Sequence, residues 1–135
     1  MIFSPIKIGT LEISNRIVVA PMCQYSAING MLTDWHTQHL MQLGFSAAGL
    51  IMVEATAEEK IGSITQNCVW IYDDKCLVSL KKNLELAKSV AANKSCFGIQ
   101  LAHAGRKAST QRPWEGRSAL TKEEKPWKTI CPSPI

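Results

Sequence analysis

Three short apolar runs, each giving way to polar sequence, limit what this chain can fold into. They span residues 17–20, 50–53 and 97–101. Runs of this length, bounded by turn residues, are typical of strands buried inside a sheet. Pro21 closes the first run, and a proline marks a strand's end because it cannot donate to a ladder. Gln100 lies inside the third run, where its amide needs a partner: a ligand, a neighbouring side chain or a water.

The segments between the runs have helical signals. Thr33 or Asp34 can cap a helix over about residues 35–47, and Asp73 or Asp74 can cap a second helix that ends near residue 92. The segment before the second helix, up to residues 70–71, reads as irregular. Beyond residue 107 the chain reads as loop to its end.

A small hairpin over residues 6–13 precedes the order strand, helix, strand, helix, strand. Crossovers of this length connect parallel strands, so the fold class is α/β. Two parallel folds compete, the doubly wound sheet and the (β/α)8 barrel. The first strand-to-helix turn lacks the G-x-G-x-x-G of a nucleotide-binding sheet, and no P-loop occurs.

The chain has 135 residues, of which 46% are apolar and 19% charged, as expected for a single domain over residues 1–135 with one core. The net charge of +4 is scattered, and Glu123 and Glu124 interrupt its densest cluster, so no nucleic-acid partner is expected. No window approaches the roughly 20 apolar residues of a membrane helix, and no signal peptide opens the chain, so we expect no membrane partner and a cytoplasmic location.

Metal and disulfide chemistry have little support. The five cysteines are an odd set without C-x-x-C spacing, which indicates neither a disulfide framework nor a zinc site. His36 and His39 stand at i and i+3, a spacing that can chelate a metal, but no third ligand has suitable spacing. Packing and hydrogen bonding at a helix start is the preferred interpretation, and no metal is expected.

Polar side chains follow or end each apolar run. They are Cys23 and Tyr25 for the first run, Glu54 and Thr56 for the second, and Gln100 and His103 for the third. The carboxyl ends of parallel strands form the ligand-binding face of α/β proteins, so these residues make a candidate site. Polar residues also gather there simply because loops begin there.

Three motifs, at residues 15–25, 49–57 and 98–108, resemble successive signatures of the old yellow enzyme family, in its bacterial, Cys-containing branch. The resemblance covers nearly the whole chain in the family's order. It implies an FMN-dependent (β/α)8 barrel that takes hydride from NAD(P)H and passes it to an activated alkene such as an enone.

The resemblance also implies roles for individual residues. Those along the flavin ring, mostly through backbone groups, would be Ala20, Pro21, Met22 and Cys23, joined by Ala55 from the second strand. Gln100 would bind the pyrimidine edge, Tyr25 would face the substrate, and the Cys23 thiol would tune the flavin potential. Glu54 is not a base in this family, so we expect its carboxylate to be bonded to backbone or to an Arg. No role follows for His103.

The chain departs from the family pattern in two ways. Gly62-Ser63-Ile64 lacks the Arg that commonly stands at the second position, and a (β/α)8 barrel needs about 250 residues. The family's substrate-binding pair, Tyr proton donor and phosphate loops come from later strands, so no catalytic residue is expected within this chain. We therefore expect the N-terminal part of a (β/α)8-barrel ene-reductase: three β/α units and a hairpin, inactive alone. The alternative is a non-catalytic half-barrel that forms homo-oligomers or docks on a partner.

Overall fold

A parallel sheet centred on one long strand organises the molecule. In the computed structural model, which describes residues 1–133, this strand is β4 (Leu50–Ala57). Strand β6 (Cys96–Ala102) pairs with it along nearly its whole length. On the opposite edge, β3 (Val18–Val19) pairs with the start of β4 and β5 (Val69–Trp70) with its end. The predicted α/β class with parallel strands is confirmed.

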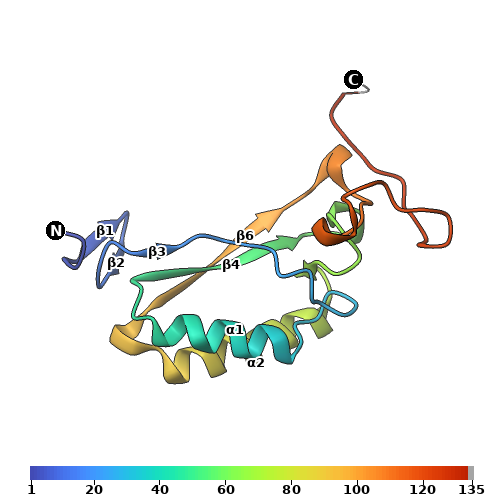
Figure 1. Ribbon diagram of the computed structural model, residues 1–135. Helices are drawn as coiled ribbons and strands as arrows, with labels where there is room; N and C mark the ends of the chain where they lie inside the picture. Colours follow the sequence, from blue (N-terminus) through green and yellow to red (C-terminus); the bar gives the residue numbers. More distant parts are fainter. Residues whose placement is uncertain (134–135) are drawn as a thin grey trace.

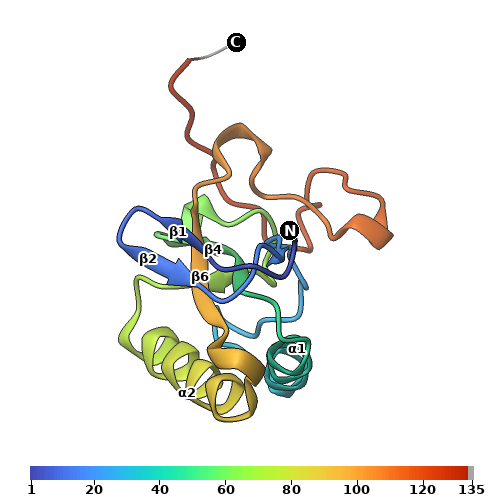
Figure 2. The same cartoon turned by 90° about the vertical axis from the view of Figure 1, so that its left-hand side faces the viewer.

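Both long helices cover the same face of this sheet. Helices α1 (Asp34–Phe45) and α2 (Asp74–Val90) lie side by side beneath it (Figures 1 and 2). Their inward residues and those of the strands form one core, because an amphipathic helix buries its apolar stripe against the sheet. The core includes Leu40, Val53, Val69, Leu80 and Ala87. No helix among residues 1–133 is long and apolar enough to cross a membrane.

The predicted hairpin closes the amino ends of the strands. Strands β1 (Ile6–Ile8) and β2 (Leu11–Ile13) pair antiparallel, and the turn between them uses Gly9 at φ +59°. Figure 1 shows the hairpin at the end of the sheet opposite the loops that follow β4 and β6. Those loops therefore stand apart from the hairpin, at the carboxyl edge of the sheet.

Several predicted boundaries are wrong. Strand β4 runs on to Ala57, so Glu54 and Thr56 lie inside it and not after it. The two-residue β5 lies in the segment expected to be irregular, because so short a strand carries no periodicity. The first helix ends two residues earlier than predicted, before Ala47 turns the chain at φ +59°.

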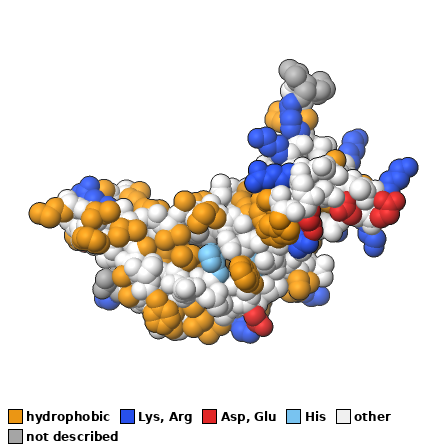
Figure 3. Space-filling model, viewed as in Figure 1, with side chains coloured by type: hydrophobic (Ala, Val, Ile, Leu, Met, Phe, Trp, Pro, Cys, Tyr) orange, Lys and Arg blue, Asp and Glu red, His pale blue; other side chains and the backbone are white. Residues whose placement is uncertain are grey.

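The remaining elements are short 3₁₀ turns: η1 (Lys60–Gly62), η2 (Ala92–Lys94), η3 (Gly105–Lys107) and η4 (Pro113–Glu115). Residues 108–133 are otherwise loop, as predicted, and the loop predicted for residues 134 and 135 lies outside the described part of the chain. Figure 3 shows that most charged side chains on this side of the molecule lie on the segment after β6, whereas the surface over the sheet and helices is mostly hydrophobic or uncharged.

No helix from residues 1–133 covers the second face of the sheet. Val18 is 48% exposed, and Gln100 is exposed as well. The expectation that the third strand is covered on both faces is therefore wrong within the described residues, because α1 and α2 cover one face only. We call the uncovered side the open face.

Candidate functional site

A β-bulge in β4 decides which side chains reach the open face. The register with β6 shifts between Val53 and Ala55, which leaves Glu54 as the extra residue. Side chains alternate along a strand, so without the bulge Glu54 would follow Leu50 and Met52 onto the open face. With the bulge, Glu54 is buried and Ala55 takes that place.

Ala55 is paired with Gln100 of β6, so the two side chains lie next to each other on the open face. Gly98 lies one step earlier on the same side of β6. A Cβ atom there would come within 2.6 Å of Met52 Sδ, so any larger residue would require the Met52 side chain to move. Ala20, two residues beyond Val18, is also exposed. Three residues predicted to contact flavin thus come from three neighbouring strand regions.

The segment after β3 carries Cys23 and Tyr25. The Cys23 thiol lies close to the Tyr25 side chain and the Ala55 backbone, and its interactions with both lower its pKa. Burial is the main reason that the pKa of Cys23 is raised to about 11, and the negative charge of Glu54 raises it further. Tyr25 has a φ of +50°, a left-handed conformation that a bulky residue adopts only when its surroundings impose it.

A tryptophan from the loop after β6 packs against Tyr25. The ring of Trp114, from η4, meets the ring of Tyr25 edge to face, with centroids 5.8 Å apart. The Arg112 guanidinium lies 5.4 Å from the Trp114 ring centroid. Trp114 is 65% exposed, so it is not a core residue, and its contact anchors the loop beside Tyr25, the residue predicted to face the substrate. The only sequence signal for this contact was the presence of an aromatic residue in a long loop.

Glu54 is buried between the sheet and α1. Its Oε2 accepts a 3.1 Å hydrogen bond from the Gln24 backbone N–H, and its Oε1 lies 3.3 Å from His36 Nε2. The predicted bond to backbone is confirmed, whereas the predicted alternative of an Arg partner is wrong, since a histidine occupies that place. His36 also caps α1, because its Nδ1 accepts from the Thr33 N–H at 3.0 Å.

His39 lies nearby on α1. Burial lowers its pKa, and the charge of Glu54 opposes that effect. Within residues 1–133 no three histidine, cysteine or acidic side chains come close enough to hold a metal ion. The helix-start interpretation of His36 is confirmed by its capping bond.

Two of the polar residues at the strand ends do not join the site. His103 Nε2 lies 2.9 Å from Glu59 Oε1 at the surface. Thr56 is fully buried, and its hydroxyl donates to the Glu54 carbonyl within the same strand. Neither side chain is placed where it could meet a ligand on the open face.

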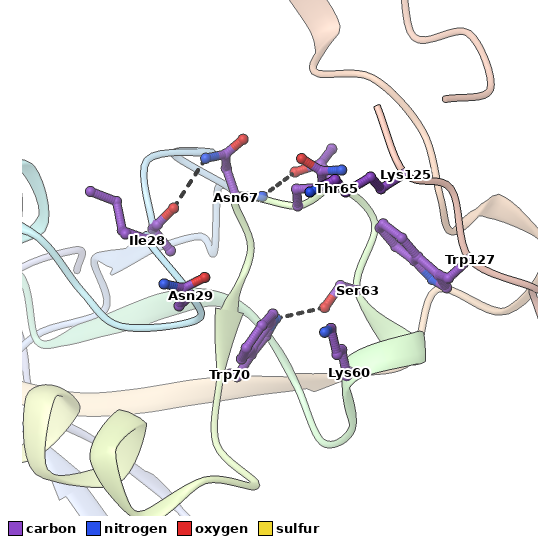
Figure 4. A pocket seen from close by; sticks show the side chains of 11 residues that line it. Ile28, Asn29, Lys60, Ser63, Thr65, Asn67, Trp70, Lys125 and Trp127 are labelled. Atoms are coloured by element: carbon purple, nitrogen blue, oxygen red, sulfur yellow. Dashed lines mark hydrogen bonds between the residues drawn. The ribbon is translucent and has the colours of Figure 1, made fainter. Parts of the chain in front are cut away.

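A separate cavity of about 490 Å³ opens between the loops after β3 and β4 and the C-terminal segment (Figure 4). Trp70, Trp127 and Lys60 are among its lining residues. Trp70 Nε1 donates to Ser63 Oγ at 2.8 Å, and Trp127 Nε1 donates to the Ile61 carbonyl at 3.1 Å. Both tryptophans anchor their segments through these bonds, and Ser63, which stands where the family commonly has Arg, is bonded to one of them. None of the predicted flavin contacts lines this cavity.

Comparisons with known proteins agree with this architecture. Residues 1–133 match the model of the NADH:flavin oxidoreductase / NADH oxidase family. An NADH:flavin oxidoreductase from Gibberella zeae is 41% identical over 137 residues, covering 99% of this chain and 32% of the relative. An NADPH dehydrogenase from Bacillus subtilis is 38% identical over 125 residues, covering 91% of this chain and 36% of the relative.

Among solved structures, an old yellow enzyme from Pichia sp. AKU4542 matches 80% of this chain and 28% of its own, with a TM-score of 0.72 and 29% identity. The chain therefore spans about a third of the length of these relatives. Its sheet and helices correspond to the N-terminal part of their barrel. On the family match and the fold together, this chain belongs to the old yellow enzyme / NADH:flavin oxidoreductase family, of which it carries the N-terminal portion.

Proposed function

We propose that this chain provides the first flavin-facing strands of an FMN-dependent NAD(P)H oxidoreductase that reduces activated alkenes, such as enones. One observation carries the proposal: Ala20, Ala55 and Gln100 lie on the same open face, at the carboxyl edge of a parallel sheet. Ligands of parallel α/β proteins bind at this edge.

The residues present fit a planar, hydrogen-bonding cofactor. The side chains of Ala20 and Ala55 are small, so a flat ring can approach the strand backbone closely. The side chain of Gln100 is exposed and makes no hydrogen bond to the rest of residues 1–133, so its amide can donate to and accept from a heterocycle edge. Cys23 and Tyr25 border this surface through their contact with each other and with Ala55.

FMN, once bound, would supply the chemistry of hydride transfer between NAD(P)H and an activated alkene. The chain's own residues have other tasks. One side of the flavin ring would lie along the segment formed by Pro21, Met22 and Cys23. Gln100 would orient the pyrimidine edge of the ring through hydrogen bonds. Cys23, whose raised pKa keeps it a neutral thiol, offers a weak donor near the ring. Tyr25 takes the substrate side.

The test uses FMN binding and turnover. The purified protein is incubated with FMN and desalted, and bound flavin is measured by its absorption band. The protein that contains the remaining β/α units is then assayed for NADPH and NADH oxidation with cyclohexenone. We expect the longer protein to retain flavin after desalting and to oxidise NADPH or NADH when the enone is present. A longer protein that neither retains FMN nor consumes reductant with an enone contradicts the proposal.

A second candidate function is a non-catalytic half-barrel that forms homo-oligomers through the open face. Val18, 48% exposed, and Met22, 59% exposed, are the observations that favour it. Size-exclusion chromatography with light scattering separates the two functions, because a folded, flavin-free dimer of this chain supports the second one alone.

A further inference from the structure

Glu54 is a buried carboxylate placed by a defect in the sheet. The bulge in β4 turns it away from the open face and into the interior, so that its side chain is only 3% exposed. A buried carboxylate is costly unless hydrogen bonds or an opposite charge compensate for lost hydration. Bulges are also enriched next to active sites, where they redirect a side chain. Its partners therefore indicate what it does.

Two N–H groups face this carboxylate. The Gln24 backbone donates to Oε2, and His36 Nε2 lies 3.3 Å from Oε1 without the alignment of a hydrogen bond. Because His36 Nδ1 accepts from the Thr33 N–H, the neutral ring carries its proton on Nε2, toward Glu54. A cavity of about 10 Å³ borders both side chains. Glu54 thus lies against His36 of α1 and binds the backbone of the segment after β3 through the Gln24 N–H.

We propose that Glu54, oriented by His36, is a positioning residue that holds the backbone of residues 22–25 in the conformation that presents Cys23 and Tyr25. That these two residues face a flavin and its substrate rests on the proposed function. That Glu54 holds the backbone of residues 22–25 does not depend on the proposed function.

The position of Gln24 supports this role. It lies between Cys23 and Tyr25, and Tyr25 has a strained φ of +50° that needs an external hold. The Gln24 side chain bonds to the Met22 carbonyl and to Trp35 at the surface, so its backbone N–H is the group anchored to the interior. Glu54 faces the helix layer and not the open face, which leaves it no contact with a substrate there.

Three variants test the proposal. Glu54→Gln keeps the shape but has a single acceptor oxygen for two N–H groups, and Glu54→Ala removes both acceptors. The matched control is Glu59→Gln, which breaks the exposed Glu59–His103 pair on the same strand edge. Hydrogen exchange of the Gln24 amide, measured by NMR, reports the bond between Gln24 and Glu54 directly. We expect exchange about ten- to a hundredfold faster in both Glu54 variants, because a bond to a charged acceptor is lost or weakened, and no change in the control.

The second readout is the pH profile of Cys23 alkylation by iodoacetamide, followed by peptide mass spectrometry. Glu54 and Cys68 raise the pKa of Cys23 electrostatically, and its interaction with Tyr25 lowers it. Glu54→Gln removes the nearest carboxylate charge, so we expect the midpoint to move to lower pH. A side chain that only fills space would leave the midpoint unchanged in a folded Glu54→Gln, because the loss of the Glu54 charge is what moves the midpoint in this direction. If Glu54→Ala fails to fold, the Glu54→Gln variant still decides the question.

The outcomes separate this proposal from the proposed function. Neither readout needs FMN, so a protein that binds no flavin yet shows fast Gln24 exchange in Glu54→Gln supports the positioning role alone. Unchanged Gln24 exchange and an unchanged Cys23 midpoint in a folded Glu54→Gln overturn it, whatever the flavin result. In the FMN-loaded protein, a flavin potential that differs between Glu54→Gln and Glu59→Gln adds support.

Discussion

The ring of Tyr25 meets the ring of Trp114 at an interplanar angle of 83°, joining the segment after β3 to a loop that lies almost ninety residues later in the chain. Edge-to-face pairs of this kind contribute about 0.5–1.5 kcal/mol beyond the area that they bury. The contact therefore connects Tyr25, whose backbone φ is strained, to a long loop. Segments of this kind are usually more mobile than strands and helices.

Replacing Trp114 by Ala should therefore loosen this corner. We expect a loss of about 1 kcal/mol in the free energy of unfolding and faster proteolysis of residues 108–120. Urea unfolding and limited proteolysis measure these effects. Trp114→Phe keeps an aromatic edge and should retain most of the stability. Equal losses in both variants would show that the ring pair contributes nothing.

Cys23 should react slowly although it is only partly buried. Its pKa of about 11 lies two units above the ordinary value of 9.0, so at pH 8 its thiolate fraction is about a hundredfold lower than that of a free thiol. Iodoacetamide labelling between pH 7 and 11 should accelerate toward the upper limit. Added FMN should slow labelling further if it covers Cys23, and unaltered labelling by saturating FMN would contradict that contact.

The same group makes stability depend on alkaline pH. In the unfolded chain Cys23 ionises near 9, whereas in the folded chain it stays protonated until about 11. Between these values the folded state binds more protons, so the free energy of unfolding falls as pH rises. Cys68, whose pKa burial also raises, acts in the same direction. Thermal unfolding at pH 8 to 11 should show a smaller decline in Cys23→Ala, and an identical decline would refute the assignment.

Gln100 offers a direct test of the cofactor surface. Gln100→Leu removes both the donor and the acceptor at the expected pyrimidine edge, so we expect FMN to bind about tenfold more weakly or worse. Flavin fluorescence titration measures the affinity. Gln38→Leu is the matched control, because that residue lies on α1 and bonds only to Gln42 at the surface. Equal affinities in the two variants would exclude Gln100 from the flavin site.

Asn15 ties β3 to the turn before β4. Its Oδ1 accepts from the Gly49 and Ile17 N–H groups, and its Nδ2 donates to the Ala47 carbonyl at 2.8 Å. Asn15→Ala leaves these groups unpaired in a buried place, so we expect a loss of about 3 kcal/mol in the free energy of unfolding. Urea denaturation checks it, with exposed Gln42→Ala as a control that should change stability by less than about 0.5 kcal/mol.

Much of the fold could be predicted because its signals are local. Gly9 and its neighbours indicate the hairpin, Pro21 ends a strand, and Thr33 and Asp73 cap the helices that follow them. The parallel order follows from crossover length. Short elements escaped prediction: β5 has two residues, and its place depends on the end of β4.

The candidate site was predictable only as a set of residues. Ala55 and Gln100 come from family motifs, and the chain positions alone do not say that they are neighbours. The partner of Glu54 was predicted as backbone or Arg, and no sequence pattern pointed to His36, which starts a helix eighteen residues earlier. Trp114 gave no local signal of its contact with Tyr25.

The sequence by itself determined the family, the α/β class and the residues expected to contact a flavin, because motifs, caps and periodicity are written in neighbouring positions. Only the tertiary structure decided which face of the sheet each side chain occupies. The bulge at Glu54 exists through the register of β4 with β6, and a one-residue shift sends each side chain to the opposite side of a sheet. That shift puts Ala55 beside Gln100 on the open face and Glu54 beside His36 in the interior. Register is a property of two strands held together, so it is settled by packing and not by either strand's own residues.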